Sequence, residues 1–160
     1  MHKINICLDS KIWIRNVPKI ENKIRQILKK SIMTEKLFFK KKIEITVLLT
    51  RSKKMRFLNY KYRKINKDTD VLSFPCETPI FFEKKIIHKN IYLGDIALSF
   101  DYIAKQNQNF NDYLKKILIH GFLHLIGHNH KSNKSFLRME RAQSKIIIYY
   151  EQKRKYKYYF

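Results

Sequence analysis

Four of the six histidines of this 160-residue chain lie in one short segment, residues 120–130. An apolar run over residues 117–126 predicts that a buried helix carries the first two of them, His120 and His124. Two helical residues four positions apart differ by about 40° around the helix axis and by about 6 Å along it. Both imidazoles can therefore reach one metal ion.

The residues that follow predict how a third imidazole joins them. Gly127 falls where a helix commonly ends in a left-handed residue, which glycine adopts at low cost, so the chain can turn back and bring His130 to the same ion. The spacing His-x-x-x-His-x-x-Gly-x-x-His is that of the metzincin zinc site. A single histidine on an apolar helix face is usually a core residue, whereas three at this spacing favour a metal site. Three imidazoles at about 2.0–2.1 Å leave a fourth position for water, which is typical of catalytic zinc.

The residue after the first histidine argues against peptide hydrolysis. Metzincin-like peptidases place a glutamate there as the general base, and this chain has Gly121. A metallopeptidase therefore remains an alternative, but this chain lacks the general base that such an enzyme needs. Phosphodiester cleavage needs less from such a base and more from cations, because charge develops on the phosphoryl oxygens.

The charge of the chain points to a polyanionic partner. Lysine and arginine number 35 against 13 acidic residues, which gives a net charge of +22. A charge of this size raises the local concentration of polyanions. A compositional bias towards Lys, Ile, Asn, Phe and Tyr is an alternative source of the excess of lysine and arginine. The positive sign of the net charge nevertheless favours nucleic acid as the partner.

Length and composition predict one cytoplasmic domain over residues 1–160, with a basic tail at about 153–160. Cys7 and Cys76 form no metal-binding spacing and are expected to be reduced thiols. The N-terminus has no signal-peptide pattern, and no apolar run is long enough to span a membrane. We therefore expect no membrane partner.

The hydrophobic pattern predicts an α+β fold in which about five helices pack on a mixed, roughly four-stranded sheet. Gly94 predicts a bulge or a close backbone approach, and residues 76–90 show no period and are expected to form an excursion or flap. The expected strands are 4–8, 43–49, 71–74 and 91–99, and the expected helices are 20–28, 52–58, 101–108, 112–126 and 135–146.

Three separated stretches resemble the YbeY family of rRNA maturation endoribonucleases. They are Leu58 to Arg63 followed by Thr69 to Pro75, then Leu93 to Ile96, and then His120 to His130. The resemblance implies one zinc ion held by His120, His124 and His130 in a metzincin-like geometry, and a functional role for Arg63. It departs at His128 and Asn129, where the family usually has Tyr and Asp.

The resulting hypothesis is a zinc-dependent endoribonuclease that cuts single-stranded RNA in rRNA 3'-end maturation and ribosome quality control. His124 and Arg63 are its candidate catalytic residues; an arginine binds phosphate through a planar fork of donors. Its expected partners are rRNA and the ribosome or small-subunit proteins, without DNA specificity. The second alternative is a ribosome-associated RNA-binding protein in which zinc is purely structural.

Overall fold

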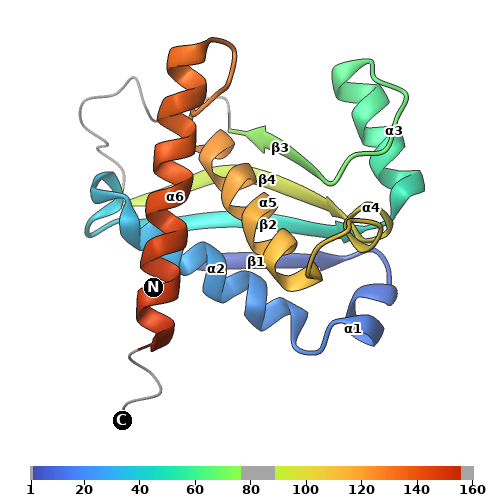
Figure 1. The fold of residues 1–160 in the computed structure, drawn as a ribbon, viewed down its shortest axis with the longest axis horizontal. Coiled ribbons are helices and arrows are strands. Elements are labelled where there is room, and N and C mark those ends of the chain that lie inside the picture. The colour runs from blue at the N-terminus through green and yellow to red at the C-terminus, as the bar shows by residue number, and fades with distance from the viewer. Residues whose placement is uncertain (1, 77–88, 156–160) are drawn as a thin grey trace.

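The computed structural model describes residues 2–76 and 89–155 and contains a four-stranded mixed sheet (Figure 1). Its strand order is β1-β2-β4-β3, and β1, β2 and β4 are parallel while β3 runs antiparallel at the edge. The strands are β1 (Lys3–Leu8), β2 (Lys42–Thr50), β3 (Val71–Pro75) and β4 (Asn90–Ser99). The predicted mixed sheet and all four predicted strands are confirmed.

Six α-helices and one 3-10 helix accompany the sheet in the described part of the chain. They are α1 (Ile12–Asn16), α2 (Ile20–Thr34), η1 (Lys36–Phe38), α3 (Ser52–Arg63), α4 (Phe100–Ala104), α5 (Phe110–Leu125) and α6 (Asn133–Lys155). The sequence predicts about five helices; the additional one, α1, has five residues and is too short to show a helical period.

Two unequal layers cover the sheet. On one face, alternate strand residues such as Val47 and Leu49 pack against α2 and α5, and α6 packs on both of these helices (Figure 1). On the other face, a small cluster joins Leu72 and Ala97 to Met55 of α3. Because successive strand residues point to opposite faces, both clusters arise from the same strands.

Gly94 confirms the predicted irregularity of β4. The pairing of β2 with β4 shifts register beside it, and its φ of 126° lies in a region that glycine tolerates. A Cβ at this position would meet the carbonyl oxygen of Phe74 at 2.1 Å. The glycine therefore permits the close approach of the edge strand β3.

Several predicted boundaries are corrected. The helix predicted at 52–58 continues to Arg63, and no side chain caps its start, although Thr50 and Ser52 are suitable cap residues. The helix predicted at 101–108 ends at Ala104. Helix α6 extends to Lys155, into the predicted basic tail. The rest of that tail and most of the predicted excursion, residues 77–88, lie outside the described residues.

Cys7 and Cys76 are not joined by a disulfide. Within the described ranges, no helix combines the length and apolar character needed to cross a membrane.

Candidate functional site

The end of α5 turns the chain back at Gly127, as the spacing predicts. Gly127 has a φ of 93°, its amide donates to the carbonyl of His124 at 3.0 Å, and the amide of His128 donates to the carbonyl of Leu123 at 2.9 Å. These two bonds satisfy carbonyls of the last helical turn, as in a Schellman motif. The chain that leaves this turn places His130 beside the helical histidines.

Three imidazoles converge at this end of α5. Ligand atoms of His120, His124 and His130 all lie within 4.8 Å of one another, and they are the one such group in the described part of the chain. The Nε2 atoms of His120 and His124 are 3.1 Å apart. Two nitrogens bound tetrahedrally to one zinc at 2.0–2.1 Å would be about 3.3 Å apart, so the pair fits such an ion. His128 is outside the group.

Hydrogen bonds to the outer nitrogens orient two of these rings. His124 Nδ1 lies 2.9 Å from the carbonyl oxygen of His128, and His120 Nδ1 lies 3.3 Å from Oε1 of Gln143 on α6. Since a carbonyl oxygen can only accept, each Nδ1 carries the proton and each Nε2 keeps its lone pair for a metal. Gln143 is a functional candidate that the sequence prediction missed, because nothing local links it to His120.

Burial keeps the helical histidines neutral. It lowers the pKa of His120, and with the neighbouring His120 ring it lowers the pKa of His124 to about 4. Metal ligation requires neutral imidazole, so the helical pair is ready to bind an ion at neutral pH.

Gly121 brings α5 into close contact with β3. A Cβ on Gly121 would lie 3.1 Å from both Ser73 Oγ and Val71 Cγ2, and the Ser73 hydroxyl donates to the Gly121 carbonyl at 3.1 Å. Helix and strand therefore touch where a metzincin peptidase would carry its glutamate. Any side chain at position 121 would require Ser73 or Val71 to shift.

An open cleft of about 640 Å³ lies over the histidines. Its lining includes residues of β3, the exposed Arg63 at the end of α3, and Lys116 of α5 as a second cation. Lys64, with a φ of 60°, ends α3 in a left-handed residue directly after Arg63. The structure thus brings Arg63 and the three histidines, far apart in sequence, to one cleft.

Asp70 is the acidic residue of the cleft lining. Its carboxylate accepts bonds from the Tyr113 hydroxyl at 2.6 Å, the Thr69 hydroxyl at 3.1 Å and the Val71 amide at 2.7 Å. Burial and this carboxylate raise the pKa of Tyr113, so its hydroxyl stays a donor. The bonds hold Asp70 within the cleft wall and tie α5 to the start of β3.

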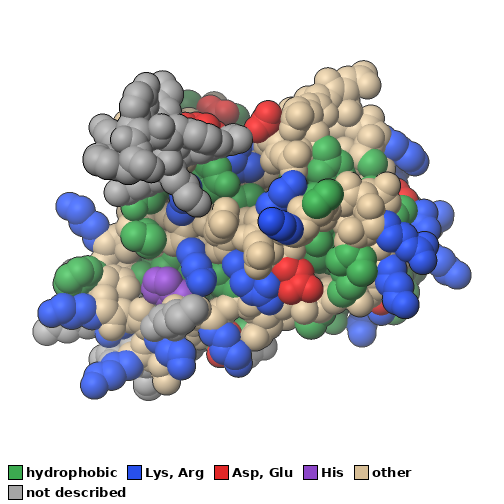
Figure 2. Space-filling model, turned by 90° about the horizontal axis from the view of Figure 1, so that it is seen from below, with side chains coloured by type: hydrophobic (Ala, Val, Ile, Leu, Met, Phe, Trp, Pro, Cys, Tyr) green, Lys and Arg blue, Asp and Glu red, His purple; other side chains and the backbone are tan. Residues whose placement is uncertain are grey.

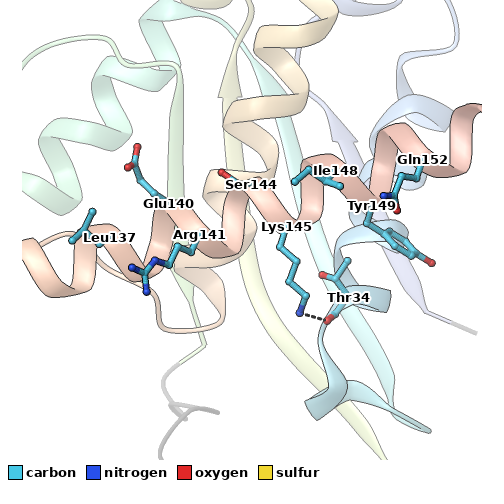
Figure 3. Close-up of a pocket in the computed structure, with 9 residues that line it drawn as sticks. All are labelled: Thr34, Leu137, Glu140, Arg141, Ser144, Lys145, Ile148, Tyr149 and Gln152. Carbon is cyan, nitrogen blue, oxygen red and sulfur yellow. Dashed lines mark hydrogen bonds between the residues drawn. The ribbon is translucent and has the colours of Figure 1, made fainter.

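A second hollow of about 660 Å³ lies between α6 and Thr34 at the end of α2 (Figure 3). Lys145 spans it by donating to the Thr34 carbonyl at 3.1 Å, and Leu137 and Ile148 contribute apolar surface. Its lining contains neither histidine nor cysteine, and Glu140 is its single acid. It therefore lacks the donors of a transition-metal site.

Positive charge extends well beyond the cleft. Figure 2 shows the molecule from below relative to Figure 1, and lysines and arginines are spread across this face with few acids among them. The distribution of charge therefore does not identify the position of the site. The three histidines and Arg63 identify it.

The fold and the site together define a class of protein: a single α+β domain with a three-histidine cluster at a helix end, beneath an open cleft lined by cations. The family model described as endoribonuclease YbeY matches residues 7–151. The chain belongs to this family, whose named activity is that of a hydrolase acting on phosphodiester bonds.

Curated relatives agree with this assignment. Endoribonuclease YbeY of Pelagibacter ubique is 37% identical over 158 residues, covering 96% of this chain and 99% of the relative. The Mycoplasmopsis pulmonis protein of the same name is 37% identical over 120 residues, covering 72% of this chain and 78% of the relative. The solution structure of a Thermotoga maritima protein superposes with a TM-score of 0.53 at 24% identity over 96% of this chain and 93% of the other, and it supports the fold alone.

Proposed function

We propose that this protein is a zinc-dependent endoribonuclease that cuts single-stranded RNA in the cleft between Arg63 and the histidines, with rRNA as its natural substrate. The observation that carries the proposal is the meeting of His120, His124 and His130 with Arg63 at one cleft. The family name supplies the reaction type, and the cationic lining suits a phosphate backbone.

The donor set favours zinc as the ion. Three neutral imidazoles suit zinc, although they also accept other first-row metals. Zinc bound there would act as a Lewis acid and lower the pKa of its water towards about 7. A metzincin-like site geometry is part of this proposal.

The protein's own residues have distinct roles in it. His120, His124 and His130 hold the ion, while Gln143 and the His128 carbonyl orient the first two rings. Arg63 binds the phosphate being cut and stabilises the charge that develops on its oxygens. Whether water or the RNA 2'-hydroxyl attacks is decided by mapping which product end keeps the phosphate.

Two substitutions test these roles separately. We expect His124→Ala to lose both zinc and RNA cleavage. We expect Arg63→Glu to keep one zinc per chain but lower the cleavage rate by roughly 100-fold or more, since it removes a donor to the developing charge. Metal content by mass spectrometry and cleavage of a labelled single-stranded RNA, with and without chelator, measure both effects.

Arg141→Glu is the matched control, because Arg141 is an exposed arginine of α6 that lines the hollow in Figure 3. It makes the same change of charge away from the cleft and should cut nearly normally. Equal losses in the Arg63 and Arg141 variants would reduce the role of Arg63 to general charge. A wild-type protein that unfolds on chelation and cuts no RNA when zinc is present would favour the RNA-binding protein with structural zinc.

The proposed rRNA substrate suggests where in the cell the protein works. We propose that the protein works in the cytoplasm on ribosomal particles, where small-subunit proteins are its partners. Co-sedimentation of the full-length protein with purified small subunits would test this association.

A further inference from the structure

The outward face of α3 carries exposed aromatic rings among cations. Phe57 and Tyr60 are 56% and 55% exposed, although large apolar rings are normally buried. The opposite side of the helix holds the buried Met55 and Asn59. At 100° per residue, Phe57 and Tyr60 lie within about 60° of each other and point away from that buried side.

The helix that carries these rings is rich in positive charge. From Ser52 to Lys67 the chain has seven cations and no acid. Exposed lysines Lys53, Lys54 and Lys61 lie on the helix beside the two rings. Asp68 and Asp101 contact the helix at Ser52, more than one turn before Phe57.

The position of α3 connects this face to the cleft. Tyr60 lies one helical turn before Arg63, which lines the cleft over the histidines. Helix α3 stands at the edge of the molecule, away from α2, α5 and α6, so its outward face is open (Figure 1). A strand leaving the cleft past Arg63 meets Tyr60 first and Phe57 next.

We infer that this face of α3, formed by Phe57, Tyr60, Lys53, Lys54 and Lys61, is a stacking platform for single-stranded RNA outside the cleavage cleft. Bases stack on the two rings and the lysines neutralise the flanking phosphates, a combination that binds single strands with little sequence preference. The inference rests on the proposed function for the identity of the polyanion, and it deepens that function by naming the path of the substrate.

Fluorescence anisotropy with the metal-free full-length protein and a labelled single-stranded RNA tests the platform without cleavage. Stacking is worth about 1–3 kcal/mol per base. At the lower end, Phe57→Ala with Tyr60→Ala should weaken binding by roughly fivefold per ring, on the order of 25-fold together. Phe57→Tyr with Tyr60→Phe, which keeps both rings, should bind within about threefold of wild type.

Phe39→Ala is the matched control, because Phe39 is 75% exposed beside Lys40 and does not line the cleft. It should bind RNA like wild type. Circular dichroism verifies that each variant is folded. Unchanged RNA binding by the Phe57→Ala, Tyr60→Ala variant would overturn the platform. That result is also the one expected if the rings bind a protein partner and not RNA.

Cleavage assays separate this inference from the proposed function. If zinc-loaded wild type cuts RNA and the double alanine variant binds and cuts equally well, the platform is wrong and the activity stands. If wild type cuts no RNA while the double alanine variant still loses affinity, the platform stands and the activity is wrong.

Discussion

At the scale of single residues, the site depends on which nitrogen of each imidazole is free. Two acceptors fix this choice for the helical histidines, the His128 carbonyl for His124 and Gln143 for His120. The first comes from the turn that ends α5, so the metal loop supports its own ligand. His128, where the family pattern has Tyr, contributes through its backbone, which any residue provides. Gln143 comes from another helix and can be tested independently of the loop.

We expect Gln143→Leu to weaken zinc binding by about tenfold, at the low end of the range for outer-sphere partners, because the 3.3 Å bond to a neutral amide is long. Gln143→Glu should tighten it, since a carboxylate accepts more strongly from Nδ1. Competition with a chromogenic chelator measures both. Gln152→Leu, at an exposed glutamine of the same helix, should bind zinc normally. Wild-type affinity in Gln143→Leu would contradict the positioning role.

At the scale of elements, α5, which carries His120 and His124, packs closely against β3, and residues of both elements line the cleft. Gly121 allows this contact, and Ser73 bonds to its carbonyl. The absence of a side chain at this position therefore has two consequences. It removes the peptidase base, and it lets β3, which lines the cleft, approach the helix that carries His120 and His124.

We expect Gly121→Glu to destabilise the protein by about 3 kcal/mol or more, because its side chain must displace β3. Gly121→Ala should leave the free energy of unfolding nearly unchanged. Alanine gains about 1 kcal/mol of helix propensity over glycine, and two tight Cβ contacts of 3.1 Å offset this gain. Urea unfolding measures the free energies. Asn111→Glu, at an exposed position in the first turn of α5, should stay within about 0.5 kcal/mol of wild type. A stable Gly121→Glu protein that cleaves peptides would contradict the packing argument.

The sequence allowed prediction of those features that depend on neighbours in the chain. The helix, the glycine turn and the returning His130 lie within eleven residues, and Gly94 marked its own bulge. Three features depended on contacts between distant segments: the Gln143 bond to His120, the packing of Ser73 on Gly121, and the antiparallel edge position of β3. Hydrophobic periodicity gives the buried face of an element but not the element it meets.

At the scale of the whole molecule, the net charge is +22, and lysines and arginines are spread across the face shown in Figure 2. Such a surface attracts RNA in many orientations, and this attraction falls with salt because counterions are released. Correct placement then needs features that charge alone lacks. The cleft supplies them through Arg63 and the histidines, and the aromatic face of α3 would add a direction along which the strand runs.

The stability of the metal-free protein should depend on pH through the same histidines. Burial lowers the pKa of His120, and that of His124 to about 4, below the value near 6.5 expected in the unfolded chain. Between about pH 6.5 and 4 the unfolded chain therefore binds protons that the folded protein does not, so stability falls as pH falls through this window. We expect urea unfolding in chelator to give a lower free energy at pH 5 than at pH 7. The difference should shrink, without vanishing, in His120→Asn with His124→Asn, because His2 and His128 also have lowered pKa values. An equal loss of stability in wild type and the double variant would show that the buried pair does not cause it.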